Sequence, residues 1–173
     1  MLNVNLLKAT ADHIGILRNL SIKTFAATYA QYNTEENMRH YIETEFSIEK
    51  LLENIKNPFS DFYFAMEAKV PVGYIKVNYA PSQTDLNDTK SLELERIYVL
   101  EEYQGKKTGQ FLLDAARNIA VENDFDYLWL GVWDKNANAR KFYAKNGFVA
   151  FDTHTFMLGD DIQNDILMKL PTR

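Results

Sequence analysis

A short turn ahead of a helix has the residue pattern that points most clearly to chemistry. In the segment YQGKKTGQFLLDAA, residues 103–116, apolar residues recur at helical spacing, so a helix begins near Gly109. Lys106 and Lys107 precede it, at the end where the helix macrodipole is already positive. Gly105 lowers the steric barrier to close approach of a ligand to the backbone. A bound anion would explain the two cations, and so would plain solvation of both lysines.

Two common phosphate-binding motifs do not fit this turn. A P-loop needs a glycine five residues before Gly105 and a serine or threonine directly after the lysine. The sequence has Leu100 and Lys107 at those positions. Gly105 and Gly109 also do not form the G-x-G-x-x-G pattern of dinucleotide-binding folds. Both motifs are therefore excluded here.

Composition limits the class of protein. The chain of 173 residues is 46% hydrophobic and 25% charged, which is typical of one globular domain, and we expect a single domain over residues 1–173. Its net charge of −5 argues against non-specific binding to nucleic acid and favours a cationic ligand. The absence of cysteine excludes disulfides, thiolate metal sites and a cysteine acyl-enzyme. The three histidines have no metal-ligand spacing, so we expect no metal.

Targeting signals are not evident. The segment MLNVNLLKAT lacks the charged and then apolar regions of a signal peptide. No apolar run approaches the roughly 20 residues that span a bilayer. We therefore expect a cytoplasmic protein, monomeric or homodimeric, with no membrane partner.

Hydrophobic periodicity and capping residues predict the elements that must position the turn. TFAATYAQYN, from residue 24, is expected to be partly loop, and PSQTDLNDTK, residues 81–90, to be a mobile loop. Strands are predicted over 3–8, 62–67, 72–79, 91–99, 127–132, 148–156 and 165–170, and helices over 12–24, 34–58 in two pieces, 108–123 and 136–146. This order predicts an α+β fold with a mixed, mostly antiparallel twisted sheet and helices on both faces.

Two segments resemble one known family. LERIYVLEEYQGKKTGQFLL resembles the acetyl-CoA-binding signature of the GCN5-related N-acetyltransferase (GNAT) family, which has Gln or Arg, two residues, Gly, any residue, then Gly or Ala. Gln104 and Gly109 match its ends, whereas Lys107 replaces the first glycine. Residues 136–148 resemble the later family segment N-x-x-A-x-x-F-Y-x-x-x-G-F, and the two matches together cover residues 91–150.

The rest of the chain resembles the PaiA-type spermine/spermidine acetyltransferases of bacteria. The similar segments are SIKTF from residue 21, NMRHY from residue 37, LELERIYV, LGVWDKN and HTFMLGDDIQNDILM. This resemblance implies a GNAT-like fold, acetyl-CoA as co-substrate and a small cationic amine as acceptor.

The resemblance also implies where the co-substrate binds. Backbone N–H groups of the turn would hold the pyrophosphate, with the lysines as counter-charges. The pantetheine arm would pair with backbone groups of Ile97 and Val99, where strand 127–132 diverges from strand 91–99. The expected cofactor-binding residues are Ile97, Tyr98, Val99, Gln104, Gly105, Lys106, Lys107, Thr108, Gly109, Asn136 and Lys145.

Tyr143 and Glu95 are the expected catalytic residues. Tyr143 matches the family tyrosine that protonates the departing CoA thiolate, and a core tyrosine beside Phe142 is the alternative. An amine with a pKa of about 10.4 must lose a proton before it attacks, and a carboxylate can help. Glu93 and Glu95 lie on one face of their strand, roughly 6.6–7 Å apart. Glu95 is the candidate base or water organiser, and an ion pair with Lys76 or an arginine is its alternative.

The predicted activity is N-acetylation of a primary amine of spermidine or spermine. With no cysteine, direct attack of the amine in a ternary complex is expected. Acetylation of a protein N-terminus or lysine is one alternative, and a CoA-sensing regulator with little turnover is another. The candidate residues for amine binding through carboxylates and aromatic faces are Glu93, Tyr29, Tyr32 and Trp133, with Glu35, Glu36 and residues 159–161 as further ones.

Overall fold

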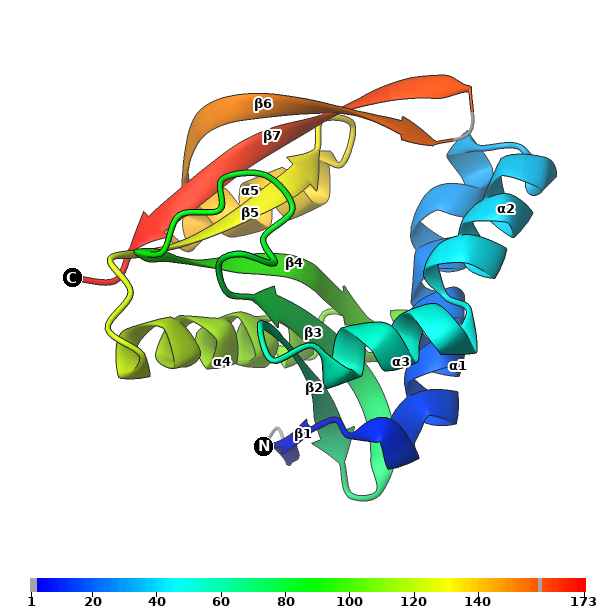
Figure 1. Ribbon diagram of the computed structural model, residues 1–173, viewed down its shortest axis with the longest axis horizontal. Helices are drawn as coiled ribbons and strands as arrows, with labels where there is room; N and C mark the ends of the chain where they lie inside the picture. The colour runs from blue at the N-terminus through cyan, green and yellow to red at the C-terminus, as the bar shows by residue number, and fades with distance from the viewer. Residues whose placement is uncertain (1–2, 159) are drawn as a thin grey trace.

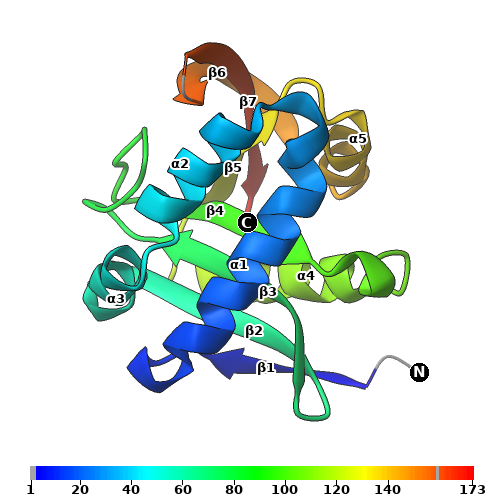
Figure 2. The same ribbon diagram turned by 90° about the vertical axis from the view of Figure 1, so that its right-hand side faces the viewer.

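A seven-stranded sheet forms the frame of the protein (Figures 1 and 2). The computed structural model describes residues 3–158 and 160–173. Within these residues, no helix is both long and apolar enough to cross a bilayer. The elements are β1 Val4–Lys8, α1 Ile14–Tyr29, α2 Glu35–Glu45, α3 Ile48–Lys56, β2 Ser60–Glu67, β3 Val70–Asn78, β4 Ser91–Val99, α4 Thr108–Glu122, β5 Tyr127–Trp133, α5 Ala137–Lys145, β6 Val149–Leu158 and β7 Asp161–Pro171.

The strand order is β1-β2-β3-β4-β5-β7-β6, and all neighbouring strands are antiparallel except β4 and β5. These two strands run parallel, and they pair only from Ser91 to Glu93 on β4 and from Tyr127 to Trp129 on β5. Beyond that point they diverge, which Figure 1 shows as a wedge between β4 and β5. The predicted sheet type and the predicted divergence of strand 127–132 are both confirmed.

Helices cover both faces of the sheet, as the periodicity predicts (Figure 2). On one face, α4 buries Leu112 and Ala116 against the sheet in a cluster that also contains Tyr143 of α5. On the other face, α1 buries Leu17 and Phe25 in a second cluster with residues of α2, α3, β2 and β3. β4 lies between the two clusters, so both of its faces are packed. This packing fixes the position of β4 where it diverges from β5.

The helix predicted to end near Thr24 runs five residues further, so only the end of TFAATYAQYN leaves the α-helix. α1 continues to Tyr29, and a 3₁₀ turn follows over Ala30–Tyr32. Phe25 stacks on Tyr41 of α2 with 4.3 Å between the ring centroids. The Thr24 hydroxyl donates to the Leu20 carbonyl at 2.8 Å, so this helix buries its own polar group. Tertiary packing of an aromatic face stabilises the extra turns, which local propensity alone did not predict.

The C-terminal hairpin is longer than predicted. β6 continues to Leu158, and β7 begins at Asp161 rather than at residue 165. β7 lies between β5 and β6, so both of its edges make ladder pairs. Pairing with β6 holds the polar run 161–165 in strand conformation, although its composition resembles a loop.

Candidate active site

A cleft with a volume of about 710 Å³ opens where β4 and β5 diverge. It is lined by the C-terminal half of β4, the turn before α4, the end of β5, and α5. Two catalytic and nine cofactor-binding residues of the sequence prediction line it, namely Glu95, Tyr143, Ile97, Tyr98, Val99, Gln104, Gly105, Lys107, Gly109, Asn136 and Lys145. Segments far apart in the sequence thus meet around one opening.

The turn before α4 presents unpaired amide groups to this cleft. Gly105 and Lys107 both have left-handed backbone conformations, with φ angles of 72° and 68°. In the described part of the chain, the N–H groups from Gly105 to Gly109 donate to no backbone carbonyl. Successive free N–H groups at a helix N-terminus form a concave anion-binding surface. The residues present therefore fit a diphosphate.

Two of the predicted cofactor-binding side chains point elsewhere. Lys106 lies outside the cleft, and its Nζ is 4.9 Å from the centroid of the Tyr103 ring. The Thr108 side chain is buried below the turn, and its hydroxyl has no hydrogen-bond partner among the described residues. Neither side chain lines the cleft, because the left-handed residue Lys107 turns the chain between them.

β4 offers an open backbone edge to the cleft. From Leu94 onward it has no ladder partner on the β5 side within the described residues. Ile97 and Val99 lie on this stretch and line the cleft. The Gln104 side chain donates from Nε2 to the Val99 carbonyl at 3.2 Å, which ties the turn to the strand.

Tyr143 is both a core residue and a cleft residue. It is 7% exposed, and its ring lies against Phe142 and Phe148 with centroid separations of 5.4 and 5.7 Å. Its hydroxyl makes no hydrogen bond to another described residue, and the residue lines the cleft. Burial raises the pKa of Tyr143 above its ordinary value, so its proton is retained throughout the physiological range.

The Glu95 carboxylate interacts with three neighbouring polar side chains. Lys76 Nζ lies 2.5 Å from its Oε2, Arg96 Nε lies 3.3 Å from its Oε1, and the Asn78 amide donates to it at 2.6 Å. Burial opposes ionisation, but the charges of Arg96 and Lys76 outweigh it and hold the pKa of Glu95 below its usual value. The ion pair that the sequence offered as an alternative is therefore present, in a residue that also lines the cleft.

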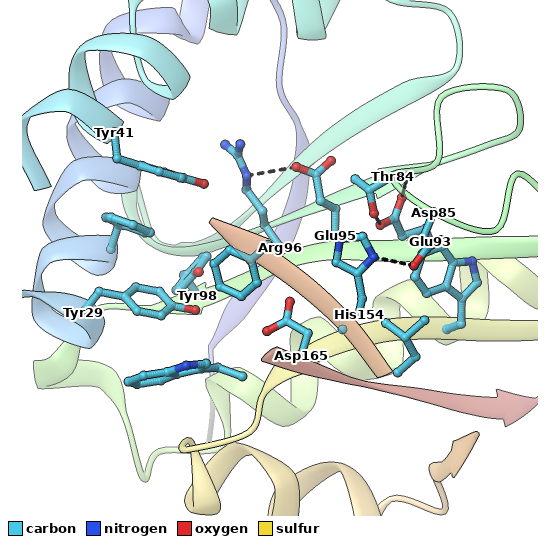
Figure 3. A pocket seen from close by; sticks show the side chains of 16 residues that line it. Tyr29, Tyr41, Thr84, Asp85, Glu93, Glu95, Arg96, Tyr98, His154 and Asp165 are labelled. Atoms are coloured by element: carbon cyan, nitrogen blue, oxygen red, sulfur yellow. Dashed lines mark hydrogen bonds and ion pairs between the residues drawn. The ribbon is translucent and has the colours of Figure 1, made fainter. Parts of the chain in front are cut away.

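A smaller cavity of about 270 Å³ continues from the cleft (Figure 3). The two share five lining residues: Tyr29, Glu95, Tyr98, Gly131 and Trp133. We call the larger space the outer cleft, the smaller one the inner cavity and these five residues the junction. Figure 3 shows Glu93, Asp85, His154 and Asp165 facing the inner cavity. A ligand in the outer cleft and a second ligand in the inner cavity would thus meet at the junction.

Comparison with known proteins identifies the family of this chain. The family model described as the acetyltransferase (GNAT) family matches residues 22–148, which includes the turn, β4, β5 and α5. The chain belongs to the GNAT acetyltransferase family. It is an acetyl-CoA-dependent N-acetyltransferase of the GNAT type.

Individual GNAT relatives cover nearly the whole chain. An uncharacterized N-acetyltransferase from the pepI 3′ region of Lactobacillus delbrueckii subsp. lactis is 38% identical over 87% of each chain. A spermidine N(1)-acetyltransferase of Thermoplasma acidophilum is 28% identical over 88% of this chain and 92% of its own. The crystal structure of PaiA N-acetyltransferase from Thermoplasma acidophilum, in complex with coenzyme A, superposes with a TM-score of 0.81 at 26% identity, covering 98% and 99% of the two chains.

The predicted amine-binding residues of this GNAT protein fall into two groups. Tyr29 and Trp133 line the junction, and Tyr32 packs edge-on against Trp133 at 4.9 Å without lining either space. Glu93 lines the inner cavity, but it already accepts hydrogen bonds from Thr84. Burial, and then the negative charge of Glu95, raise the pKa of Glu93.

The remaining acidic candidates lie away from the junction. Glu35 lines neither space, and Glu36 lines a separate surface depression with Asp160. Asp161 accepts a hydrogen bond from the buried Gln163 at 2.8 Å, and Gly159 lies outside the described residues.

Sequence reasoning missed one wall of the inner cavity. This wall is formed by β6, β7 and loop 81–90. Asp165 and His154 come from the hairpin, and Asp85 comes from the loop. The Nδ1 atom of His154 lies 2.8 Å from the Asp85 carboxylate. Several hydrogen bonds anchor the loop, including one from the Thr84 N–H to Glu93 at 2.9 Å and one from the Gln83 amide to the Ser91 carbonyl. His154 and Asp165 belong to the segment HTFMLGDDIQNDILM that resembles the PaiA type. That resemblance gives them no role, because only the pairing of β5, β7 and β6 brings them to the site.

Proposed function

We propose that this protein transfers an acetyl group from acetyl-CoA to a primary amine of a small polyamine such as spermidine or spermine, by direct attack in a ternary complex. The observation that carries the proposal is the junction of two connected spaces, one with an anion-binding turn and one lined by carboxylates. Aromatic faces of Tyr29, Tyr98 and Trp133 at the junction suit a cationic acceptor, because rings attract ammonium groups. The similarity to the spermidine N(1)-acetyltransferase supports the same acceptor class.

The outer cleft supplies the groups that bind the co-substrate. The free N–H groups of residues 105–109 would bind the diphosphate, and the open edge of β4 would pair with the pantetheine amides. Asn136 caps α5 by accepting from the Ala139 N–H at 3.1 Å, which fixes the helix that presents Lys145. Bound acetyl-CoA would supply an activated thioester, and these residues would hold it at the end of the outer cleft next to the junction.

Tyr143 and Glu95 have complementary proposed roles. Tyr143 holds a proton at its hydroxyl and donates it to the leaving thiolate, because a buried neutral phenol next to an anion is a suitable acid. Glu95, ionised and held by Lys76 and Arg96, is a weak base, so it orients a water through which the amine proton passes to bulk solvent. Its fixed negative charge also favours the approach of a cationic acceptor.

Lys107 offers a separate test of the anion-binding turn. Lys107→Gly and Lys107→Ala both remove the charge, and we expect each to weaken acetyl-CoA binding by about three- to fivefold, more at low salt. Only glycine also relieves the left-handed conformation at φ 68°, so the glycine variant should be about 1 kcal/mol more stable than the alanine variant. Calorimetry and urea unfolding measure the two effects. Equal stability of the two variants would contradict the strained turn.

The substrate panel that tests the proposed function measures thiol release from acetyl-CoA. Spermidine and spermine should give a kcat/KM at least about tenfold above that of peptides with a free N-terminus or a lysine. A higher value for the peptides would replace the polyamine with a protein acceptor. Tight acetyl-CoA binding with no turnover of any amine would instead indicate a CoA sensor.

A further inference from the structure

The carboxylates of the inner cavity are not equivalent. Four carboxylates face this cavity, and three of them have hydrogen-bond or ion-pair partners within the protein. Glu95 is paired with two cations, Asp85 with His154, and Glu93 with hydrogen-bond donors from the loop and from β3. Asp165 is the fourth, and its side chain makes no hydrogen bond or ion pair with another described residue. An unpaired carboxylate that is partly buried is costly unless a ligand compensates it.

The strand pairing of β7 directs the Asp165 side chain toward the junction. β7 lies between β5 and β6, and its Asp165 is in register with Trp133 of β5 on one side and with His154 of β6 on the other. In Figure 3 its carboxylate points into the cavity, toward the side lined by Tyr29 and Tyr98. The position thus combines a free anion with two aromatic side chains, which is a suitable environment for an ammonium group.

A glycine on the neighbouring strand leaves space for this carboxylate. A Cβ atom on Gly131 would lie 3.2 Å from Asp165 Oδ2 and 3.5 Å from Asp165 Cβ. Such a contact is tight, so a larger residue would displace the carboxylate. Gly131 belongs to the junction, and Asp165 therefore stands directly beside the place where the two spaces meet.

We propose that Asp165 is the carboxylate that binds a protonated nitrogen of the acceptor amine at the junction. The inference rests on the proposed function, and it gives a role in specificity to a residue for which the sequence analysis predicted none. The acceptor class is accordingly a cationic amine, and a neutral or anionic acceptor is disfavoured. Burial raises the pKa of Asp165 to about 6, while His154 opposes the shift. A bound cation would offset this cost of ionisation.

Asp165→Asn is the direct test, because it removes the charge and keeps the shape. We expect the KM for spermidine to rise about tenfold or more, as for loss of a charged hydrogen bond, while the KM for acetyl-CoA stays within about twofold. Spermidine should raise the melting temperature of the wild-type protein with CoA bound, and it should do so much less for the variant. Asp152→Asn is the matched control, since it removes the same charge from the same hairpin outside both spaces.

A thermal melt separates binding from a structural role. At about pH 7.5 the wild-type carboxylate is ionised and unpaired, so Asp165→Asn should melt at a higher temperature than the wild type. If the Asp165 carboxylate had a structural role, Asp165→Asn would melt at a lower temperature than the wild type. An unchanged KM for spermidine in an active variant overturns the role of Asp165 and leaves the proposed function intact. No turnover of any amine by the wild type overturns the proposed function, and the role of Asp165 with it.

Discussion

Tyr143→Phe is expected to lower kcat by about 100-fold or more while the dissociation constant for acetyl-CoA changes less than about twofold. The substitution removes only the hydroxyl, and the ring keeps its contacts with Phe142 and Phe148. That hydroxyl has no described protein partner, so its loss leaves no buried group unsatisfied. Steady-state thiol release and calorimetry with acetyl-CoA measure the two quantities.

A second tyrosine, which lies outside both spaces, provides the matched control. The Tyr63 hydroxyl on β2 lies 3.4 Å from the Asp61 carboxylate, away from both spaces. Tyr63→Phe should therefore leave kcat unchanged. If Tyr143→Phe weakened acetyl-CoA binding as much as it lowered kcat, Tyr143 would be a packing residue rather than the acid.

Glu95→Gln is expected to destabilise the protein by about 3 kcal/mol and to reduce activity as well. The Lys76 and Arg96 side chains are each only 7% exposed, and both would lose their anion. Because burial also lowers the pKa of Lys76, that side chain would lose its proton more readily in the variant. Urea unfolding measures the loss, and a loss below about 1 kcal/mol would contradict a stabilising ion pair.

The pH dependence of this loss has a defined sign. The folded-state pKa of Glu95 lies below its ordinary value of 4.5, so its stabilising contribution is complete above that pH and disappears as the pH falls through the folded value. The stability difference between wild type and Glu95→Gln should therefore shrink on acidification below about pH 4.5. Lys76→Met in the Glu95→Gln background removes one orphaned cation and should recover part of the loss.

Local chemistry was sufficient to predict the co-substrate half of the site. The turn with Gly105, Lys107 and Gly109, the strand 91–99 and the helix cap Asn136 all lie where the sequence predicted them. Each of these signals is contained in a few consecutive residues, because capping, turn conformation and strand periodicity depend on near neighbours. The side chains of Lys106 and Thr108 do not line the cleft, so only their backbone N–H groups belong to the proposed diphosphate site.

The acceptor half depended on tertiary structure. Sequence reasoning found Glu93, Glu95 and the aromatic residues Tyr29 and Trp133, but it could not choose between a base and an ion pair for Glu95. That choice depended on Lys76, which the register of β3 and β4 places beside Glu95.

By itself, the sequence determined the family, the sheet type and the position of the turn that we propose as the diphosphate site, because these depend on contiguous residues. Only the tertiary structure brought Asp165 and His154 of the C-terminal hairpin against β5 and loop 81–90. A strand's partners are not specified by its own residues, so the wall that faces the acceptor became visible only once β7 was paired between β5 and β6.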